Sequence, residues 1–211
     1  MERRRCGQII HQELKRQGLQ VSLSSVQRTL ERYNLLRKRS PWKRPHDYTP
    51  RPEVKNPGDL LQIDTVQIRD PKGKRIYLYT LIDLCSRWAY AWPTQKINTR
   101  ESIKFMIRAM VQASFPFHMI QSDNGAEFSK MFTFRLNKKG LPHRHSRVRH
   151  SDDNAHIERF NRTIQEECLD RVPCTLASYR IAIKSFLKYY NHERLHMGIN
   201  FLTPLEVLRS Y

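Results

Sequence analysis

The order of the apolar runs constrains the fold of this chain more than any other feature. Four short runs rich in branched and aromatic residues lie at 60–68, 76–82, 87–92 and 117–121, and the last ninety residues carry mostly helical spacing. A Pro-Lys-Gly-Lys turn at 71–74 separates the first two runs. This order predicts three antiparallel strands, with the fourth strand beside the first, in an α/β core that spans residues 59–211.

Helix signals flank the predicted strands. Asn98 and Glu101 have the spacing of a capping box, and apolar residues follow them at helical intervals as far as Val111. Apolar stripes recur over 157–168 and 179–190, and Thr203-Pro204-Leu205-Glu206 is typical of a helix start. We therefore expect helices to pack against the sheet.

The first 36 residues predict a small, all-helical domain of two helices. Gly18 suits the end of the first helix, and the second run opens near Ser22. The apolar residues of the second run share one face: Val26, Leu30 and Tyr33. Gln27, Arg28 and Arg32 point away from that face, where a helix-turn-helix carries its DNA contacts. A DNA-binding helix-turn-helix is the favoured interpretation, and a generic helical pair is the alternative.

The charge of the chain points to a polyanionic partner. Lys and Arg number 38 against 20 Asp and Glu, which gives a net charge of +18. Half of this surplus comes from residues 1–58, which hold 14 basic and 5 acidic side chains. Residues 37–58 predict a basic, proline-rich linker, with these candidate DNA contacts: Lys38, Arg39, Lys43 and Arg44. Double-stranded DNA is the expected partner, and a merely solvated basic surface is the alternative.

Other classes of protein fit the sequence poorly. The cysteines lack the spacing of a zinc site and predict reduced thiols: Cys6, Cys85, Cys168 and Cys174. No apolar stretch has the length of a membrane span, and no apolar region follows the charged start. We expect no membrane partner.

Three acids occupy positions where metal chemistry would need them. Asp64 interrupts the apolar first strand, Asp123 follows the fourth strand, and Glu158 flanks the apolar face of a helix. A carboxylate inside an apolar strand is costly unless it binds a cation. Carboxylates from different elements can hold a pair of Mg²⁺ ions for phosphodiester chemistry. Taken singly, each acid could instead end a strand, form a turn or lie in solvent.

Five motifs together resemble the integrase core of bacterial insertion-sequence transposases, relatives of the retroviral integrases. They lie in this order: Asp64 in its strand, Leu81 to Arg87, Ser122 to Phe128, Asp153 to Thr163, and Tyr190 to Arg194 leading to Thr203-Pro204. The resemblance covers residues 55–208. It implies a ribonuclease-H-like mixed sheet with flanking helices.

The resemblance also implies residue roles. Asp64, Asp123 and Glu158 would be the catalytic ligands of two Mg²⁺ ions, for which Mn²⁺ would substitute, and Asn154 and Arg162 would face DNA. The implied reaction is cleavage at element ends followed by strand transfer, without a nucleotide cofactor. Such a transposase is expected to act as a homo-oligomer, in the bacterial cytoplasm at the nucleoid.

Two departures from the family pattern keep other functions open. Asp123 and Glu158 are separated by 34 residues, about one fewer than usual, and residues 148–152 lack the glycine and proline often found there. The single helical unit before the core is short, as expected of a reading frame truncated upstream. A truncated, non-catalytic relative that represses transposition is the main alternative, and a structure-selective nuclease is a third.

The segment 129–151 is also basic. It holds seven Lys or Arg residues and no acid, and we interpret it as a loop lying on DNA phosphates, against a merely solvated loop. His143 and His145 alternate in the segment, but no cysteine lies nearby, so zinc is disfavoured there.

Overall fold

A computed structural model describes residues 6–35, 53–146 and 151–211. The chain divides into two compact units, Met1–Pro52 with Leu195–Leu202, and Glu53–Arg194 with Thr203–Tyr211. Four predicted DNA contacts lie outside the described residues: Lys38, Arg39, Lys43 and Arg44. Residues 147–150, part of the predicted basic loop, also lie outside them.

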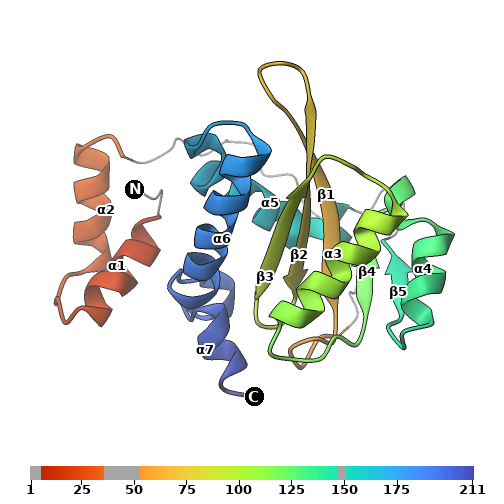
Figure 1. Cartoon of the computed structure of the whole chain (residues 1–211). Coiled ribbons are helices and arrows are strands. Elements are labelled where there is room, and N and C mark those ends of the chain that lie inside the picture. Colours follow the sequence, from red (N-terminus) through yellow and green to blue (C-terminus); the bar gives the residue numbers. More distant parts are fainter. Residues whose placement is uncertain (1–5, 36–52, 147–150) are drawn as a thin grey trace. The chain divides into compact units, whose positions relative to one another are not determined.

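The larger unit is built on one five-stranded mixed sheet (Figure 1). Its strands are β1 (Leu61–Arg69), β2 (Arg75–Asp83), β3 (Ala89–Thr94), β4 (Ile120–Ser122) and β5 (His143–His145). They lie in the order β3-β2-β1-β4-β5. β1 pairs antiparallel with β2, and β2 antiparallel with β3, whereas β1–β4 and β4–β5 are parallel. The predicted antiparallel trio, with the fourth strand beside the first, is confirmed.

The sequence-based expectation was wrong about regular structure in the segment 129–151. This segment forms helix α4 (Lys130–Asn137) and strand β5, where a loop was expected. Phe132 and Leu136 on α4 are buried in the core, so apolar contacts rather than DNA explain why this part is ordered. Strand β5 has only three residues, too few to produce a visible alternation in the sequence.

Besides α4, four α-helices lie in the described part of the larger unit: α3 (Thr99–Gln112), α5 (Ala155–Glu167), α6 (Leu176–His192) and α7 (Pro204–Leu208). Short 3₁₀ turns lie there at Ala126–Phe128, Ser151–Asn154 and Leu169–Arg171. A further 3₁₀ turn lies at Met197–Ile199, in the smaller unit. Figure 1 shows α3 across the front of the sheet and α5 behind it.

The alternation of side chains along the strands divides the core into two apolar layers. Leu61 and Ile63 of β1 face the layer that contains α3 and α4, through Phe105 and Phe132. The opposite face of the sheet packs against α5 and α6, with Phe160 among the buried residues there. This arrangement is the predicted mixed sheet with flanking helices.

Two predicted helix starts differ in how they are capped. Thr203 and Glu206 form both bonds of a capping box at α7. At α3 the Asn98 side chain accepts from the Glu101 N–H at 3.0 Å, but the Asn98 N–H donates to the Tyr79 hydroxyl instead. Only half of the predicted capping box is therefore present at α3, because a buried tyrosine takes the second bond.

The smaller unit contains the two expected N-terminal helices, α1 (Gly7–Arg16) and α2 (Leu23–Arg32). Ser22 caps α2 by accepting from the Ser25 N–H at 3.1 Å, and Gly18 takes a left-handed φ of 82° after α1. Val26 is buried as predicted, but Tyr33 is 65% exposed. Tyr33 follows Arg32, the last residue of α2, so the helix no longer directs the Tyr33 side chain towards α1.

No helix in the described ranges has the length and apolar character that crossing a bilayer requires.

Candidate functional site

Strands β1 and β4 bring Asp64 and Asp123 to the same level of the sheet. Ile63 on β1 pairs with Ser122 on β4; Asp64 is the next residue of β1, and Asp123 is the first residue after β4. Because the two strands are parallel, the acids leave the pairing at the same end. Both side chains are half-buried. The structure therefore brings together two of the three predicted catalytic acids.

Neighbouring acids contribute to the electrostatics of Asp64. Its pKa is raised to about 6, mainly by burial, and the negative charges of Asp123 and Glu127 add to the rise. Two hydrogen bonds oppose this rise: Thr65 N–H donates to Oδ1 at 2.7 Å, and Asn161 Nδ2 donates to Oδ2 at 2.8 Å. A cation bound among these carboxylates would stabilise their charged forms and would therefore lower the pKa of Asp64.

The loop after β4 holds Asp123 and Glu127 around a glycine. Gly125 N–H donates to Asp123 Oδ1 at 3.0 Å. A Cβ added to Gly125 would come within 2.8 Å of Glu127 Oε2 and 3.0 Å of Asp123 Oδ1. The two carboxylates thus converge on the position that the missing Cβ leaves open, and any larger residue there would displace them.

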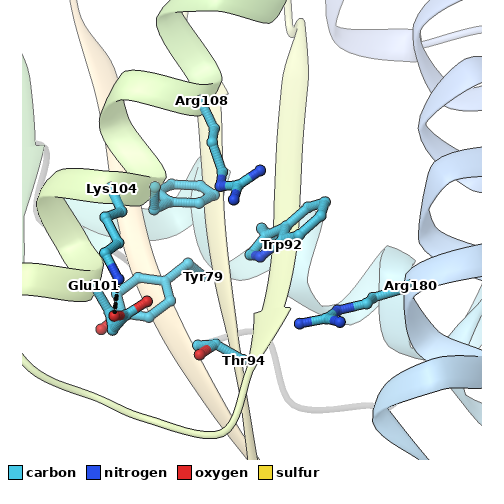
Figure 2. A pocket seen from close by; sticks show the side chains of 8 residues that line it. Tyr79, Trp92, Thr94, Glu101, Lys104, Arg108 and Arg180 are labelled. Atoms are coloured by element: carbon cyan, nitrogen blue, oxygen red, sulfur yellow. Dashed lines mark hydrogen bonds and ion pairs between the residues drawn. The ribbon is translucent and has the colours of Figure 1, made fainter.

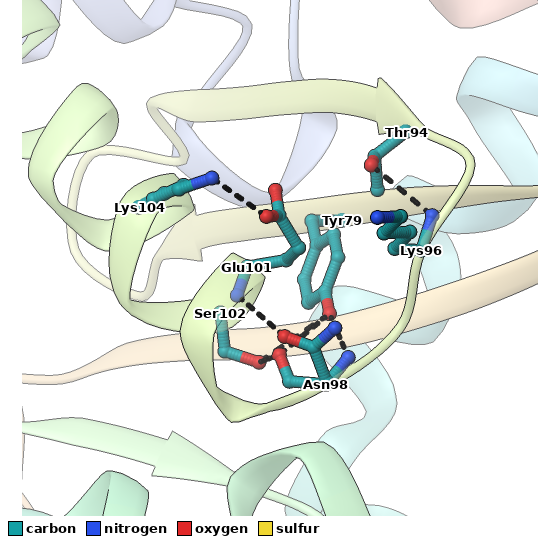
Figure 3. A network of polar contacts seen from close by, with 7 residues as sticks. All are labelled: Tyr79, Thr94, Lys96, Asn98, Glu101, Ser102 and Lys104. Carbon is teal, nitrogen blue, oxygen red and sulfur yellow. Dashed lines mark hydrogen bonds and ion pairs between the residues drawn. The ribbon is translucent and has the colours of Figure 1, made fainter.

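Polar contacts fix this loop from two sides. On the sheet side, His145 Nδ1 lies 2.8 Å from the Asp123 carbonyl oxygen. On the helix side, the Ser102 hydroxyl of α3 lies 3.1 Å from the carbonyl oxygens of Glu127 and of Asn98. Figure 3 shows how Ser102 and Asn98 gather around the hydroxyl of Tyr79. These contacts hold the backbone that carries the acids.

The third predicted acid, Glu158, lies in the first turn of α5 and is exposed. Asn161, one turn further along α5, makes the bond to Asp64 described above, so this face of the helix adjoins the acids. Across the described ranges, no three Asp, Glu, His or Cys side chains are grouped closely enough to hold a metal ion. Glu158 thus lies on the helix that contacts Asp64 through Asn161, but its own carboxylate is not grouped with those of Asp64 and Asp123.

The predicted DNA contacts have different surroundings. Asn154 is held within the protein, because its Oδ1 accepts from Gln121 Nε2 at 3.1 Å and its Nδ2 donates to Ser146 Oγ at 3.2 Å. Arg162 is exposed on α5. On α2 the predicted contact residues are all exposed: Gln27, Arg28 and Arg32.

Sequence reasoning assigned no role to Asn161 or Glu127, although both lie inside the motifs that carried the resemblance. Asn161 bonds to Asp64, and Glu127 adds to its electrostatic field. The available signal for Asn161 was its position three residues after Glu158, which places both on one helix face.

Other motif residues stabilise the fold instead. Asp83 is fully buried and accepts from the Ser86 N–H at 2.7 Å and the Gly58 N–H at 2.9 Å. Asn191 on α6 pairs with both the N–H and the carbonyl of Ala89, each at 2.9 Å, as a strand would.

A small hollow of about 140 Å³ lies beside the edge strand β3 (Figure 2). The guanidinium of Arg108 lies 4.5 Å from the ring centre of Trp92, and that of Arg180 lies 5.6 Å from it. Lys104 at its rim is paired with Glu101 at 2.8 Å. Strands β2 and β1 separate β3 from β4 in the sheet. The lining of the hollow includes neither Asp64 nor Asp123.

Solved structures with the same fold define the class. The catalytic core domain of HTLV-2 integrase in complex with magnesium aligns with a TM-score of 0.59 at 19% identity, covering 72% of this chain and 96% of that one. A simian T-cell lymphotropic virus intasome, in complex with the PP2A regulatory subunit B56 gamma, aligns with a TM-score of 0.60 at 16% identity, covering 90% of this chain and 68% of that one. The larger unit therefore has the ribonuclease-H-like fold of retroviral integrase cores.

Two family models of the integrase core domain match this sequence, one over residues 54–151 and the other over residues 139–204. The chain belongs to the integrase-core family, within the retroviral-integrase superfamily. Both models end before the C-terminus and begin after the N-terminal helices.

Relatives of this chain include an integrase and insertion-element proteins. The ORF3 protein of Spiroplasma virus SpV1-C74, named as an integrase, is 30% identical over 75% of this chain and 49% of its own length. A 31.7 kDa protein of insertion element IS407 from Burkholderia multivorans is 26% identical over 97% of this chain and 76% of its own length. The transposase of insertion sequence IS904 from Lactococcus lactis is 26% identical over 70% of this chain and 58% of its own. The chain thus spans about half to three quarters of these relatives.

Proposed function

We propose that this chain is a DNA transposase that binds the ends of an insertion element, cleaves there and joins the freed ends to target DNA. The observation that carries the proposal is the pair Asp64, on β1, and Asp123, directly after the adjacent parallel strand β4, where the charge of Asp123 helps to raise the pKa of Asp64. Membership of the integrase-core family and the transposase relatives support the same reaction.

The donor atoms at the site fit Mg²⁺ or Mn²⁺. Carboxylate oxygens are the ligands that these hard cations prefer, and a site without cysteine or histidine donors disfavours zinc. Asp64, Asp123 and Glu158 would hold two ions, with Glu158 joining from α5. Bound ions would supply charge stabilisation at the reacting phosphate and an activated water or hydroxyl oxygen.

The residues of the chain would do the remaining work. Asp64 is ready to lose its proton near neutral pH, because its pKa is about 6. Asn161 orients one oxygen of that carboxylate, and Gly125 leaves the space into which Asp123 and Glu127 point. In the transfer step, a 3′-hydroxyl oxygen bonds to a target phosphorus, the target P–O3′ bond breaks, and the departing oxygen takes up a proton. The number of phosphodiester bonds is conserved, so no ATP is needed.

The surplus positive charge supports DNA as the substrate and a DNA-binding role for α2. We infer domain roles in the order helix-turn-helix (1–36), linker (37–58) and catalytic core (59–211). Two element ends must be paired before joining, so a homo-oligomer is expected, acting at the nucleoid in the bacterial cytoplasm where its substrate lies.

Carboxamide variants test the assignment of the ligands. Asp64→Asn, Asp123→Asn and Glu158→Gln should each abolish metal-dependent cleavage of element-end DNA while DNA affinity changes by less than about threefold. Asp170→Asn, at an exposed acid on a 3₁₀ turn, is the matched control and should keep wild-type turnover. Wild-type turnover in any one of the three variants would contradict the role of that residue.

A non-catalytic relative that occupies element ends is the second candidate. The exposed position of Glu158, outside any described group of three ligands, favours it. Such a protein would bind ends with a steep salt dependence and would give no nicking with Mg²⁺ or Mn²⁺.

A further inference from the structure

Two glutamines lie side by side in the buried centre of the sheet. Gln62 on β1 and Gln121 on β4 are register partners, 1% and 2% exposed. Gln62 lies two residues before Asp64 on β1, so these two side chains share one face of the sheet, and Gln121 lies two residues before Asp123, which follows the end of β4. A buried amide is costly unless its polar atoms are bonded, so the contacts of these two residues are informative.

Both amides are bonded to the start of α5. Gln121 Nε2 donates to the Asp153 carbonyl oxygen at 2.8 Å, and Gln62 Nε2 donates to the same oxygen. Gln62 Oε1 accepts from the Ile157 N–H at 3.0 Å. Ile157 is the third residue of α5, where an N–H has no partner within a regular helix.

The usual means of holding a helix start is absent from α5. Its N-cap residue, Asn154, makes no side-chain capping bond and instead accepts from Gln121. Gln62 therefore holds the first turn of the helix through Ile157, and both glutamines hold Asp153, the residue before the N-cap. Glu158 is the next residue after Ile157.

We propose that Gln62 and Gln121 form an amide clamp that sets the position of Glu158 relative to Asp64 and Asp123. The two glutamines are positioning residues: they fix the helix that carries the third acid to the two strands that carry the others. The proposal rests on the proposed function, because it takes Glu158 as a ligand. Magnesium accepts ligand oxygens only at short, nearly fixed distances, so a small shift of α5 would cost metal affinity and rate.

Hydrogen exchange tests the clamp in the full chain without added metal. Gln62→Met keeps the side-chain length but removes both polar atoms. Exchange at the Ile157 N–H should then speed up about tenfold or more, while exchange at the Ile164 N–H in the middle of α5 stays within about twofold. Gln62→Glu, which keeps an acceptor for Ile157, should retain most of the protection. Unchanged protection of Ile157 in Gln62→Met would overturn the proposal.

Metal binding and kinetics test the consequence for the site. Gln62→Met and Gln121→Met should each weaken Mn²⁺ binding, measured by calorimetry, about tenfold, and lower kcat for strand transfer about tenfold with KM for DNA within about twofold. Ile164→Val, a change at a buried position of the same helix, is the control for a general loss of stability, and its fall in Tm is compared with that of the glutamine variants. Ile164→Val should change neither the affinity for Mn²⁺ nor kcat.

Two failures can be told apart. If the wild type binds Mn²⁺ and joins DNA, but the glutamine variants match Ile164→Val, the clamp is overturned and the proposed function stands. If the wild type does neither, the proposed function fails, and the clamp loses its role with it.

Discussion

Asp64 is the residue on which the electrostatics of the site centre. Its folded pKa of about 6 lies above the value near 4 of an unfolded aspartate. Between these two values the folded protein holds a proton that the unfolded chain has released, so the free energy of unfolding falls as pH rises from about 4 to 6. The fall attributable to Asp64 is up to about 3 kcal/mol.

We predict that this pH dependence is weaker in Asp64→Asn. Denaturant unfolding of the wild type and the variant, at pH 4 and pH 7 without divalent ions, measures the difference. The stability lost between the two pH values should be about 2 to 3 kcal/mol smaller in Asp64→Asn. Equal losses in the two proteins would mean that Asp64 has an ordinary pKa.

Asn161 lowers the pKa of Asp64 by donating a hydrogen bond to its charged form. We predict that Asn161→Ala raises the pKa of Asp64 above about 6, as followed by carboxyl carbon NMR. Gln165→Ala, at an exposed position on the same helix, should leave it unchanged. A lower pKa in Asn161→Ala would show that the bond does not act on the carboxylate.

Among the elements, a buried ion pair joins the C-terminal end of α5 to the segment that follows α6. Arg194 bonds to Glu167 through Nη2 at 2.9 Å and Nε at 3.2 Å, and the side chains are 13% and 7% exposed. Removing one partner leaves the other as an unpaired buried charge, which destabilises the protein. Removing both partners leaves no such charge.

We predict that Arg194→Met destabilises the protein by about 3 to 5 kcal/mol and that adding Glu167→Leu recovers much of the loss. A double-mutant cycle by denaturant unfolding measures both values. If the double variant were as unstable as the sum of the single variants, the two side chains would not be coupled.

The elements also show what the sequence could predict. Strands β1 and β2 were predictable because runs of branched and aromatic residues lie on both sides of a clear turn. Strand β5 was not, because three residues of His-Arg-His carry no apolar alternation and owe their pairing to β4. The positions of Asp64 and Asp123 followed from strand order, whereas the bonds of Gln62, Gln121 and Asn161 depend on how α5 crosses the sheet, which one sequence does not specify.

For the whole molecule, positive charge should control affinity for DNA. If Arg28 and Arg32 on α2 each contact a phosphate, Arg28→Ala with Arg32→Ala should lower the slope of log Kobs against log salt by about 2, at about 0.9 per phosphate. Fluorescence anisotropy with element-end duplex between 50 and 300 mM salt measures the slope.

Gln27→Ala is the matched control for this measurement, because it changes a neutral side chain on the same exposed face. It should weaken discrimination between end and unrelated DNA without changing the slope. An unchanged slope in the double arginine variant would mean that α2 does not lie on the DNA backbone.

The central claim is that the chain joins DNA ends by metal-dependent chemistry at Asp64, Asp123 and Glu158. A strand-transfer assay on labelled element-end DNA, with Mg²⁺, Mn²⁺ or EDTA, tests it most directly when wild type and Glu158→Gln are run side by side. We expect joined products with either metal, none with EDTA and none from Glu158→Gln. Tight end binding without cleavage or joining in the wild type would contradict it and would identify a non-catalytic DNA-binding relative.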